Sequence, residues 1–205
     1  MAAAPDSPAP RAPGPGAPDP GTAGRRLRHR RAARVIVRSG ATEGRPRVLL
    51  FADRDPGLPG TQWWVTPGGG MDPGETWAQT AVRELFEETG LVVGESQLQG
   101  PVASRLAVHG YSDQVLVQHE QFFLVDVDRF EVDTSRFTEL EQRTLLSHGW
   151  FDADELATRV VWPAQLGDYL AWAGEPADEW GVMDESTVPV DPDLLRAETE
   201  RYTSS

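Results

Sequence analysis

The sequence predicts an α+β fold, in which a mixed β-sheet is held between helices as an α/β/α sandwich. Several short runs of β-branched and apolar residues, separated by turns that contain glycine or proline, are typical of strands. One longer segment without interior glycine or proline carries apolar residues at helical spacing, which predicts a helix in the middle of the chain. A body with many strands and a few helices favours an α+β or mixed-sheet sandwich arrangement.

The expected strands share β-branched residues and flanking turn signals, and they are residues 33–38, 47–52, 62–65, 97–108, 114–127 and 150–151. Residues 74–89 form the main predicted helix, and Gly90 stands where a glycine is expected to end it. Two further helices are predicted at 152–158, opened by an aspartate cap, and at 163–172, opened by Pro163.

Composition divides the 205 residues into three parts. Residues 1–24 are a Pro/Ala/Gly tract that cannot bury enough apolar surface to fold, so we expect residues 1–32 to be a disordered N-terminal arm. Residues 33–173 are expected to form one folded domain. Residues 174–205 carry nine Asp and Glu side chains against two Arg, which predicts an acidic and loosely ordered tail.

The formal charge is distributed unevenly. The chain carries −13, yet residues 1–34 hold a local balance of +5, which leaves −18 on the remainder. A body this acidic repels a nucleic-acid backbone, so duplex nucleic acid is not an expected partner. The basic run at 25–31 is compatible with a tether to RNA or another anionic surface, but a solvated arm is the favoured interpretation.

Two absences narrow the class of protein. The sequence has no cysteine, which excludes disulfides, thiolate zinc sites and thiol nucleophiles. No apolar run approaches the ~20 residues needed to cross a bilayer, and the N-terminus lacks the apolar centre of a signal peptide. We therefore expect no membrane partner and a cytoplasmic location.

Three glutamates of the predicted helix provide the main chemical signal. Glu84, Glu87 and Glu88 fall at positions i, i+3 and i+4, so their side chains lie on one strip of the helix. Like-charge pairs at this spacing destabilise a helix by about 0.2–0.5 kcal/mol each. Mg²⁺ and Mn²⁺ prefer such clusters of hard oxygen ligands. By themselves, the three glutamates fit an acidic solvated helix face equally well.

A glycine-rich segment, Pro67-Gly68-Gly69-Gly70, precedes the acidic helix. Glycine allows the backbone to pass close to a bound group and to adopt positive φ angles. This segment is therefore suited to bring a backbone carbonyl to a metal ion, although a tight turn is the commoner reason for a glycine triplet.

Together, the loop and the helix resemble the Nudix box, G-x5-E-x7-R-E-U-x-E-E-x-G-U, in which U is a bulky aliphatic residue. All nine defined positions are matched with correct spacing, by Gly69, Glu75, Arg83, Glu84, Leu85, Glu87, Glu88, Gly90 and Leu91. The flanking strands, the Trp-Trp-Val-Thr-Pro-Gly-Gly lead-in and the late Trp-Phe-Asp-Ala-Asp-Glu-Leu segment also look like this family. The resemblance therefore extends over about residues 33–172.

The resemblance implies a site for Mg²⁺ or Mn²⁺ on this loop and helix. Glu87 and Glu88 correspond to the principal metal ligands. Glu84 corresponds to a further ligand or to the base that activates water. The carbonyl of Gly68 is expected to coordinate the metal as well.

The resemblance also implies supporting residues. Glu75 and Arg83 are expected to form an ion pair that orients the loop, together with Gly69. The family commonly adds one acidic residue from outside the box, and Glu120 is the candidate because it is the only acidic residue within the predicted strand segment 114–125. The rivals in a downstream loop are Glu139 and Glu141.

As an activity, the resemblance implies a metal-dependent hydrolase that cleaves the diphosphate linkage of a small-molecule nucleotide by attack of water on phosphorus. A homodimer is compatible with this interpretation. The main alternative is a non-catalytic Nudix-like domain that senses a nucleotide, although such domains tend to lose the box glutamates that are present here. A related isomerase of isoprenoid diphosphates is disfavoured, because its chemistry is associated with a cysteine.

The sequence leaves the nucleotide open, with a nucleoside triphosphate as the default. Subgroup markers are not met: Pro101 is too close to the box for the ADP-ribose pattern, Tyr111 lies beyond the dinucleoside polyphosphate window, and the coenzyme A signature is absent. Five aromatic residues are suited either to stacking on a base or to core packing, and core packing is favoured for each. They are Trp63, Trp64, Tyr111, Phe122 and Phe123.

Overall fold

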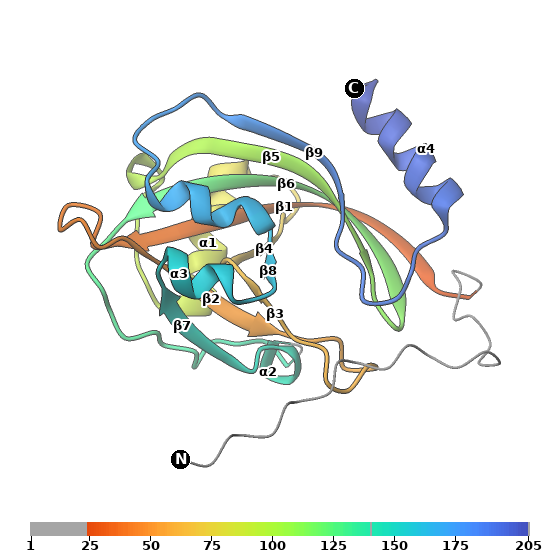
Figure 1. Ribbon diagram of the computed structural model, residues 1–205, viewed down its shortest axis with the longest axis horizontal. Helices are drawn as coiled ribbons and strands as arrows, with labels where there is room; N and C mark the ends of the chain where they lie inside the picture. Colours follow the sequence, from red (N-terminus) through yellow and green to blue (C-terminus); the bar gives the residue numbers. More distant parts are fainter. Residues whose placement is uncertain (1–23, 140, 205) are drawn as a thin grey trace, which may run out of the picture.

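The computed structural model describes residues 24–139 and 141–204 (Figure 1). The strands are β1 (Arg26–Ser39), β2 (Arg47–Asp53), β3 (Trp63–Val65), β4 (Gly68–Gly70), β5 (Gln99–Gly110), β6 (Gln114–Asp126), β7 (Ser147–Phe151), β8 (Val161–Trp162) and β9 (Asp178–Asp184). The helices are α1 (Trp77–Thr89), α2 (Glu141–Thr144), α3 (Ala153–Ala157) and α4 (Pro192–Thr203), with two 3-10 helices, η1 (Glu95–Gln97) and η2 (Ala164–Leu170).

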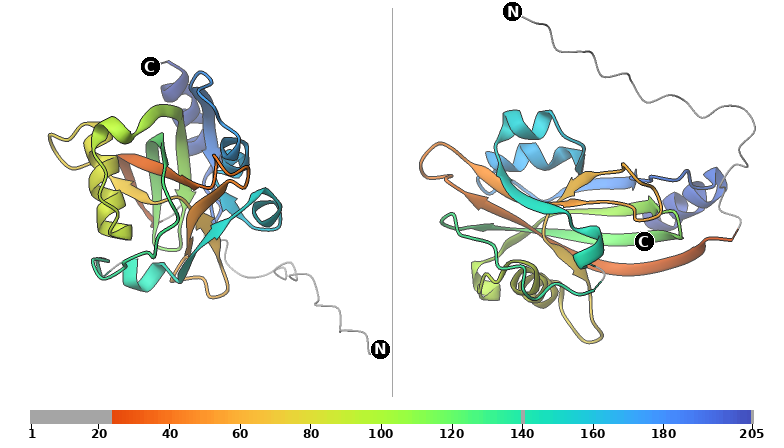
Figure 2. Two further views of the ribbon diagram at one scale, coloured as in Figure 1. Left: turned by 90° about the vertical axis from the view of Figure 1, so that its left-hand side faces the viewer. Right: turned by 90° about the horizontal axis from the view of Figure 1, so that it is seen from below.

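The strands form one mixed sheet in the order β8-β3-β2-β1-β6-β5-β9, with β4 paired to β1 and β7 paired to β2. The central pair, β1 and β6, is parallel, whereas β1 is antiparallel to β2 and to β4. Helix α1 covers one face, and α3 with η2 covers the other (Figure 2). This arrangement confirms the predicted α+β sandwich.

The alternation of side chains along β1 separates the two faces of the sheet. Val35 and Val37 pack under α1 in a cluster that includes Leu85. Ile36, between them, faces the opposite side and packs in the cluster that includes Phe122 and residues of η2. The central strand is therefore buried on both sides, which is why three apolar residues, Val35, Ile36 and Val37, follow one another.

Helix α1 has clear local signals at both ends. Thr76 is the N-cap, and its side chain and that of Gln79 bond reciprocally to each other's backbone N–H. Gly90 ends the helix at φ 73°, in the left-handed region that favours glycine. The helix begins three residues later than the predicted start at 74, because the capping threonine lies at position 76.

The expectation of a disordered arm through residue 32 is wrong for its last part. Strand β1 begins at Arg26, and residues 26–32 pair in register with 114–120 of β6. Arg25 donates hydrogen bonds to the carbonyls of Tyr111 and Pro189. Charged, exposed side chains hid this strand from the sequence, since its stability comes from backbone pairing with a distant partner. Residues 1–23 lie outside the described residues.

The expectation of a loosely ordered tail from residue 174 is also wrong. Strand β9 pairs in parallel with the outer strand β5, and α4 follows it. Val190 is buried in an apolar cluster with Leu106, Val108 and Val117. The acidic composition reports only the exposed side chains of this segment, whereas its few apolar residues complete a core with β5 and β6.

Within the described ranges, none of the helices combines the length and the apolar character required to span a membrane.

The packing of the C-terminal segment predicts a matched pair of stability effects. Val190→Ala removes buried methyl groups and is expected to lower the free energy of unfolding by about 1–3 kcal/mol. Val92→Ala makes the same chemical change at a side chain that is 78% exposed, and it is expected to change stability by less than about 0.5 kcal/mol. Urea unfolding of both variants measures the difference, and equal small effects would contradict a packed C-terminal segment.

Candidate metal and diphosphate site

The glycine segment forms strand β4, which pairs antiparallel with β1 through Gly68 and Arg34, Gly69 and Ala33, and Gly70 and Ala32. Gly68 has φ 132°, which side chains rarely adopt. A Cβ on Gly69 would lie 2.6 Å from a carboxylate oxygen of Glu84. A side chain at position 69 would therefore displace the Glu84 carboxylate.

The three box glutamates project from α1 toward this strand. Glu84 and Glu88 are buried, while the side chain of Glu87 is 46% exposed. The Glu88 carboxylate accepts a hydrogen bond from the Gly68 backbone N–H at 2.8 Å. Burial raises the pKa of the Glu84 carboxyl above its ordinary value, although Arg83 opposes this effect.

Arg83 organises the acidic cluster. One of its terminal nitrogens donates to Glu84 at 2.7 Å and to Glu87 at 3.0 Å. Its Nε and other terminal nitrogen donate to the two oxygens of Glu75, at 2.7 and 2.9 Å, and the latter nitrogen also reaches the Gly70 carbonyl. These bonds to Arg83 lower the pKa of Glu75 to about 2. Arg83 thus joins the loop to the helix.

The cluster fits a hard divalent cation in charge and donor type. In residues 24–139 and 141–204, no group of three or more His, Asp or Glu side chains stands ready to hold a metal ion. Glu84 and Glu87 turn to Arg83, while Glu88 bonds to Gly68. Arg83 nevertheless supplies one positive charge against the three glutamates that it contacts, and the excess carboxylates are the oxygen ligands that Mg²⁺ and Mn²⁺ prefer.

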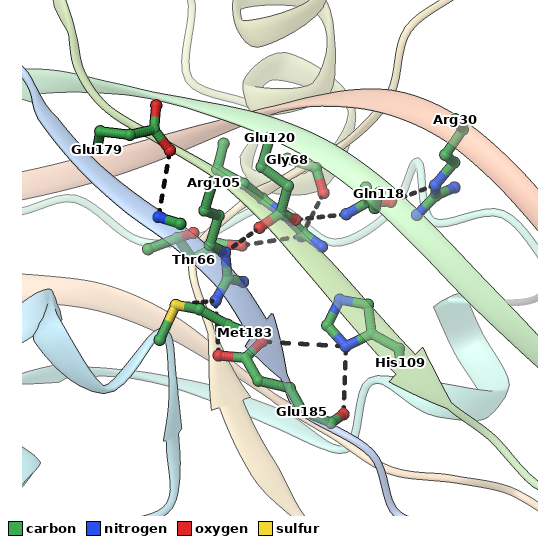
Figure 3. A network of polar contacts seen from close by, with 12 residues as sticks. Arg30, Thr66, Gly68, Arg105, His109, Gln118, Glu120, Glu179, Met183 and Glu185 are labelled. Atoms are coloured by element: carbon green, nitrogen blue, oxygen red, sulfur yellow. Dashed lines mark hydrogen bonds and ion pairs between the residues drawn. The ribbon is translucent and has the colours of Figure 1, made fainter. Parts of the chain in front are cut away.

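Glu120 lies in a buried environment and is paired with two arginines. It is fully buried in β6, where one oxygen accepts from Arg34 at 2.9 Å and the other from Arg105 at 2.6 Å (Figure 3). Burial by itself would raise the pKa of this carboxyl, but Arg105 and Arg34 outweigh it and hold the pKa well below its ordinary value. Guanidinium groups engage both oxygens of Glu120, and its role as a metal ligand stays a prediction.

Of the two rival acids, Glu139 is exposed in the loop before α2, and Glu141 is the first residue of that helix. Their role as metal ligands stays a prediction.

The Gly68 carbonyl, which the resemblance assigns to the metal, accepts a hydrogen bond from Arg34 at 2.7 Å. Arg34 therefore connects the box loop to Glu120, and Arg105 extends the connection to Glu185 at 2.6 Å. Local sequence patterns do not indicate this network, because its charged members come from four separate segments. The one available signal was the presence of charged residues inside otherwise apolar strands.

Aromatic residues on the face opposite α1 surround a cavity of about 20 Å³. Trp63 stacks on Trp162 with ring centroids 4.3 Å apart, and His109 stacks on Tyr111. Phe122 and Phe123 are core residues, as favoured from the sequence. Local sequence patterns do not identify Trp162, His109 or Glu185 as members of this cavity wall.

The comparison with known families agrees with the site geometry. Residues 28–172 match the family model of the NUDIX domain. The chain belongs to the Nudix family. This match begins within β1, which supports the ordered strand, and it ends before β9.

Individual relatives of this Nudix domain match shorter segments. An RNA pyrophosphohydrolase of Brucella ovis is 42% identical over 57 residues, which are 28% of this chain and 31% of that protein. A Nudix hydrolase of Bacillus subtilis is 47% identical over 38 residues, 18% of this chain and 24% of that protein. The matches thus span a third or less of these curated relatives.

Among solved structures, the mutator MutT protein of Bacillus halodurans superimposes with a TM-score of 0.50 at 19% sequence identity, covering 77% of this chain and 91% of that one. At this identity the likeness concerns the fold, and it agrees with the mixed-sheet sandwich described above.

The pairing of Glu120 predicts a large stability effect. Glu120→Gln leaves two buried guanidinium groups without their carboxylate, so the free energy of unfolding is expected to fall by about 3–5 kcal/mol. The exposed Glu139→Gln variant serves as the control, with an expected change within about 0.5 kcal/mol. A loss below about 1 kcal/mol for Glu120→Gln in urea unfolding would show that the two arginines do not depend on this carboxylate.

His109 predicts a pH dependence of stability. Burial lowers the pKa of this imidazole from 6.5 to about 3, so between these values the unfolded chain binds a proton that the folded chain does not. Stability is therefore fully present above pH 6.5 and declines as pH falls toward 3, by up to about 1.4 kcal/mol per pH unit. His109→Gln is expected to flatten this slope in pH-dependent urea unfolding; identical slopes for the two proteins would contradict a buried neutral imidazole.

Proposed function

We propose that this Nudix domain is a hydrolase that uses Mg²⁺ or Mn²⁺ to cleave the diphosphate linkage of a nucleotide derivative. The observation that carries the proposal is the acidic cluster beside β4. Glu84 lies against Gly69, Glu88 accepts from the Gly68 N–H, and Arg83 joins Glu84 to Glu87, which leaves excess negative charge. Family membership supports the same reaction class.

In the proposed mechanism, Glu87 and Glu88 would hold the metal with Glu84 as a further ligand or as the base. When bound, a divalent cation offsets the charge of the diphosphate oxygens and lowers the pKa of bound water. The chain's own contribution is positioning. Arg83 keeps the loop and helix together through Glu75. The low pKa of Glu75 keeps this carboxylate ionised at neutral pH.

We assign the proton-accepting role to Glu84. Its carboxylate is buried against Gly69, and burial raises its pKa above the ordinary value. A raised pKa favours a base that takes a proton from water, in contrast to Glu75, whose pKa Arg83 lowers to about 2. The water oxygen bonds to one phosphorus of the diphosphate while the bond from that phosphorus to the bridging oxygen breaks. The other half of the substrate leaves with the bridging oxygen as a phosphate-bearing group.

The substrate remains a nucleoside triphosphate or a related nucleotide in this proposal. The name of the Brucella ovis relative adds the 5′ end of RNA to the candidates. The cytoplasmic location and the homodimer expected from the sequence remain proposals as well. They do not enter the mechanism.

A specific observation favours the nucleotide-sensing alternative as a second candidate. Arg34 donates a hydrogen bond to the Gly68 carbonyl, and Arg83 donates to Glu84 and Glu87, so arginines of the chain engage these oxygens. A domain of this kind would bind a nucleotide through the same fold without hydrolysing it.

Glu87→Gln and Glu88→Gln test the proposed reaction. Each is expected to lower kcat by about a hundredfold or more, because each removes a proposed metal ligand. Phosphate and pyrophosphate release would be measured with Mg²⁺ on nucleoside triphosphates, ADP-ribose, dinucleoside polyphosphates and 5′-triphosphorylated RNA.

Glu95→Gln, an exposed glutamate of η1, is the control and is expected to retain full activity. Activity that persists in both box variants would contradict the metal assignment. A folded wild-type protein that binds nucleotides but hydrolyses none of the panel would favour the sensing alternative.

A further inference from the structure

Two neighbouring arginines of β1 point to opposite faces of the sheet. Because side chains alternate along a strand, Arg30 shares a face with Arg34, whereas Arg31 shares the α1 face with Ala33 and Val35. Arg31 is exposed, and its side chain forms no hydrogen bond or ion pair with any residue in the described parts of the chain. The pair thus offers the same charge in two different surroundings.

Arg30 is held in place by a buried residue. Its Nε donates to the side-chain oxygen of Gln118, and the Gln118 amide donates in turn to Glu120 (Figure 3). Gln118 and Glu120 are fully buried, and Glu120 is fixed by Arg34 and Arg105. A chain of side-chain contacts therefore sets the plane of the Arg30 guanidinium.

The outer edge of this guanidinium has no protein partner. Within residues 24–139 and 141–204, Arg30 makes its hydrogen bond through Nε, and its two terminal nitrogens have neither a hydrogen bond nor an ion pair. The residue is exposed. Two parallel N–H groups that are oriented and unpaired form the fork that binds phosphate and carboxylate oxygens.

The fork lies beside the box loop. A Cβ added to Gly70 would stand 3.3 Å from the nearer terminal nitrogen of Arg30. Gly70 follows Gly69, which faces Glu84 on the other side of β4. Consecutive glycines of one short strand therefore separate the acidic cluster from a cationic group.

The electrostatic surroundings leave Arg30 short of a counter-ion. Glu120 is shared by Arg34 and Arg105, and Glu185 is bonded to Arg105. Arg34 carries the same charge and repels the Arg30 guanidinium. An anion that approaches the loop would relieve this repulsion.

We propose that Arg30 forms a phosphate-binding subsite at the edge of the box loop, where its terminal nitrogens bind oxygens of the substrate's diphosphate group. The inference rests on the proposed function for the identity of the ligand. Gln118 is a positioning residue for this subsite, because it acts by orienting Arg30. Arg30 and the box carboxylates lie on the two faces of β4, so the diphosphate would meet both at the edge of this strand that does not pair with β1.

Methylenediphosphonate provides a direct probe, since it has two linked phosphorus groups, no base and no cleavable bridge. Its binding would be measured by titration calorimetry in the presence of Mg²⁺. Arg30→Ala is expected to weaken binding tenfold or more, and Arg30→Lys to weaken it less, because lysine keeps the charge but not the fork. Arg31→Ala changes net charge equally and is expected to stay within about twofold of wild type.

The outcomes test the Arg30 subsite separately from the proposed hydrolase function. Equal losses for Arg30→Ala and Arg31→Ala would overturn the subsite, since a general field would then explain binding. An unchanged affinity in Arg30→Ala, with unfolding matching the wild type, would overturn it too, as would a wild-type protein that binds no diphosphonate. A selective loss in Arg30→Ala supports the subsite even when the nucleotide panel shows no hydrolysis, in which case only the proposed function fails.

Discussion

The burial of one carboxylate, that of Glu120, constrains the centre of this molecule. A buried charge must be paired, and this one is paired by Arg34 from β1 and Arg105 from β5, on the two strands that flank β6. Arg34 also holds the Gly68 carbonyl, and Gln118 uses Glu120 to orient Arg30. The packing of three strands and the position of the box loop therefore depend on the same network.

Strand β4 has a charged group on each of its two faces. Successive residues of a strand face opposite directions, so Gly69 meets Glu84 under α1 while Gly70 meets Arg30 on the other face. The absence of side chains brings both groups close to the backbone. Negative charge suited to a divalent cation and positive charge suited to phosphate thus lie a strand's thickness apart.

Local features of the fold were predictable where side chains near in sequence carry the information. Helix α1 was visible from its apolar stripe and from Gly90, and the ion pair of Glu75 with Arg83 lies within one loop and helix. The same reasoning failed at residues 26–32 and beyond residue 174. Those segments owe their order to pairing with β6 and β5, which no local pattern reports.

By itself, the sequence determined the mixed-sheet sandwich, the loop and helix of the box, and the residue types that its chemistry needs, because periodicity and spacing act over a few residues. Only the tertiary structure decided that Glu120 pairs with two arginines, and that Arg30 stands beside Gly70 while Arg31 does not. The physical reason is that a buried charge selects its partners by distance in space, and those partners come from strands that are far apart along the chain.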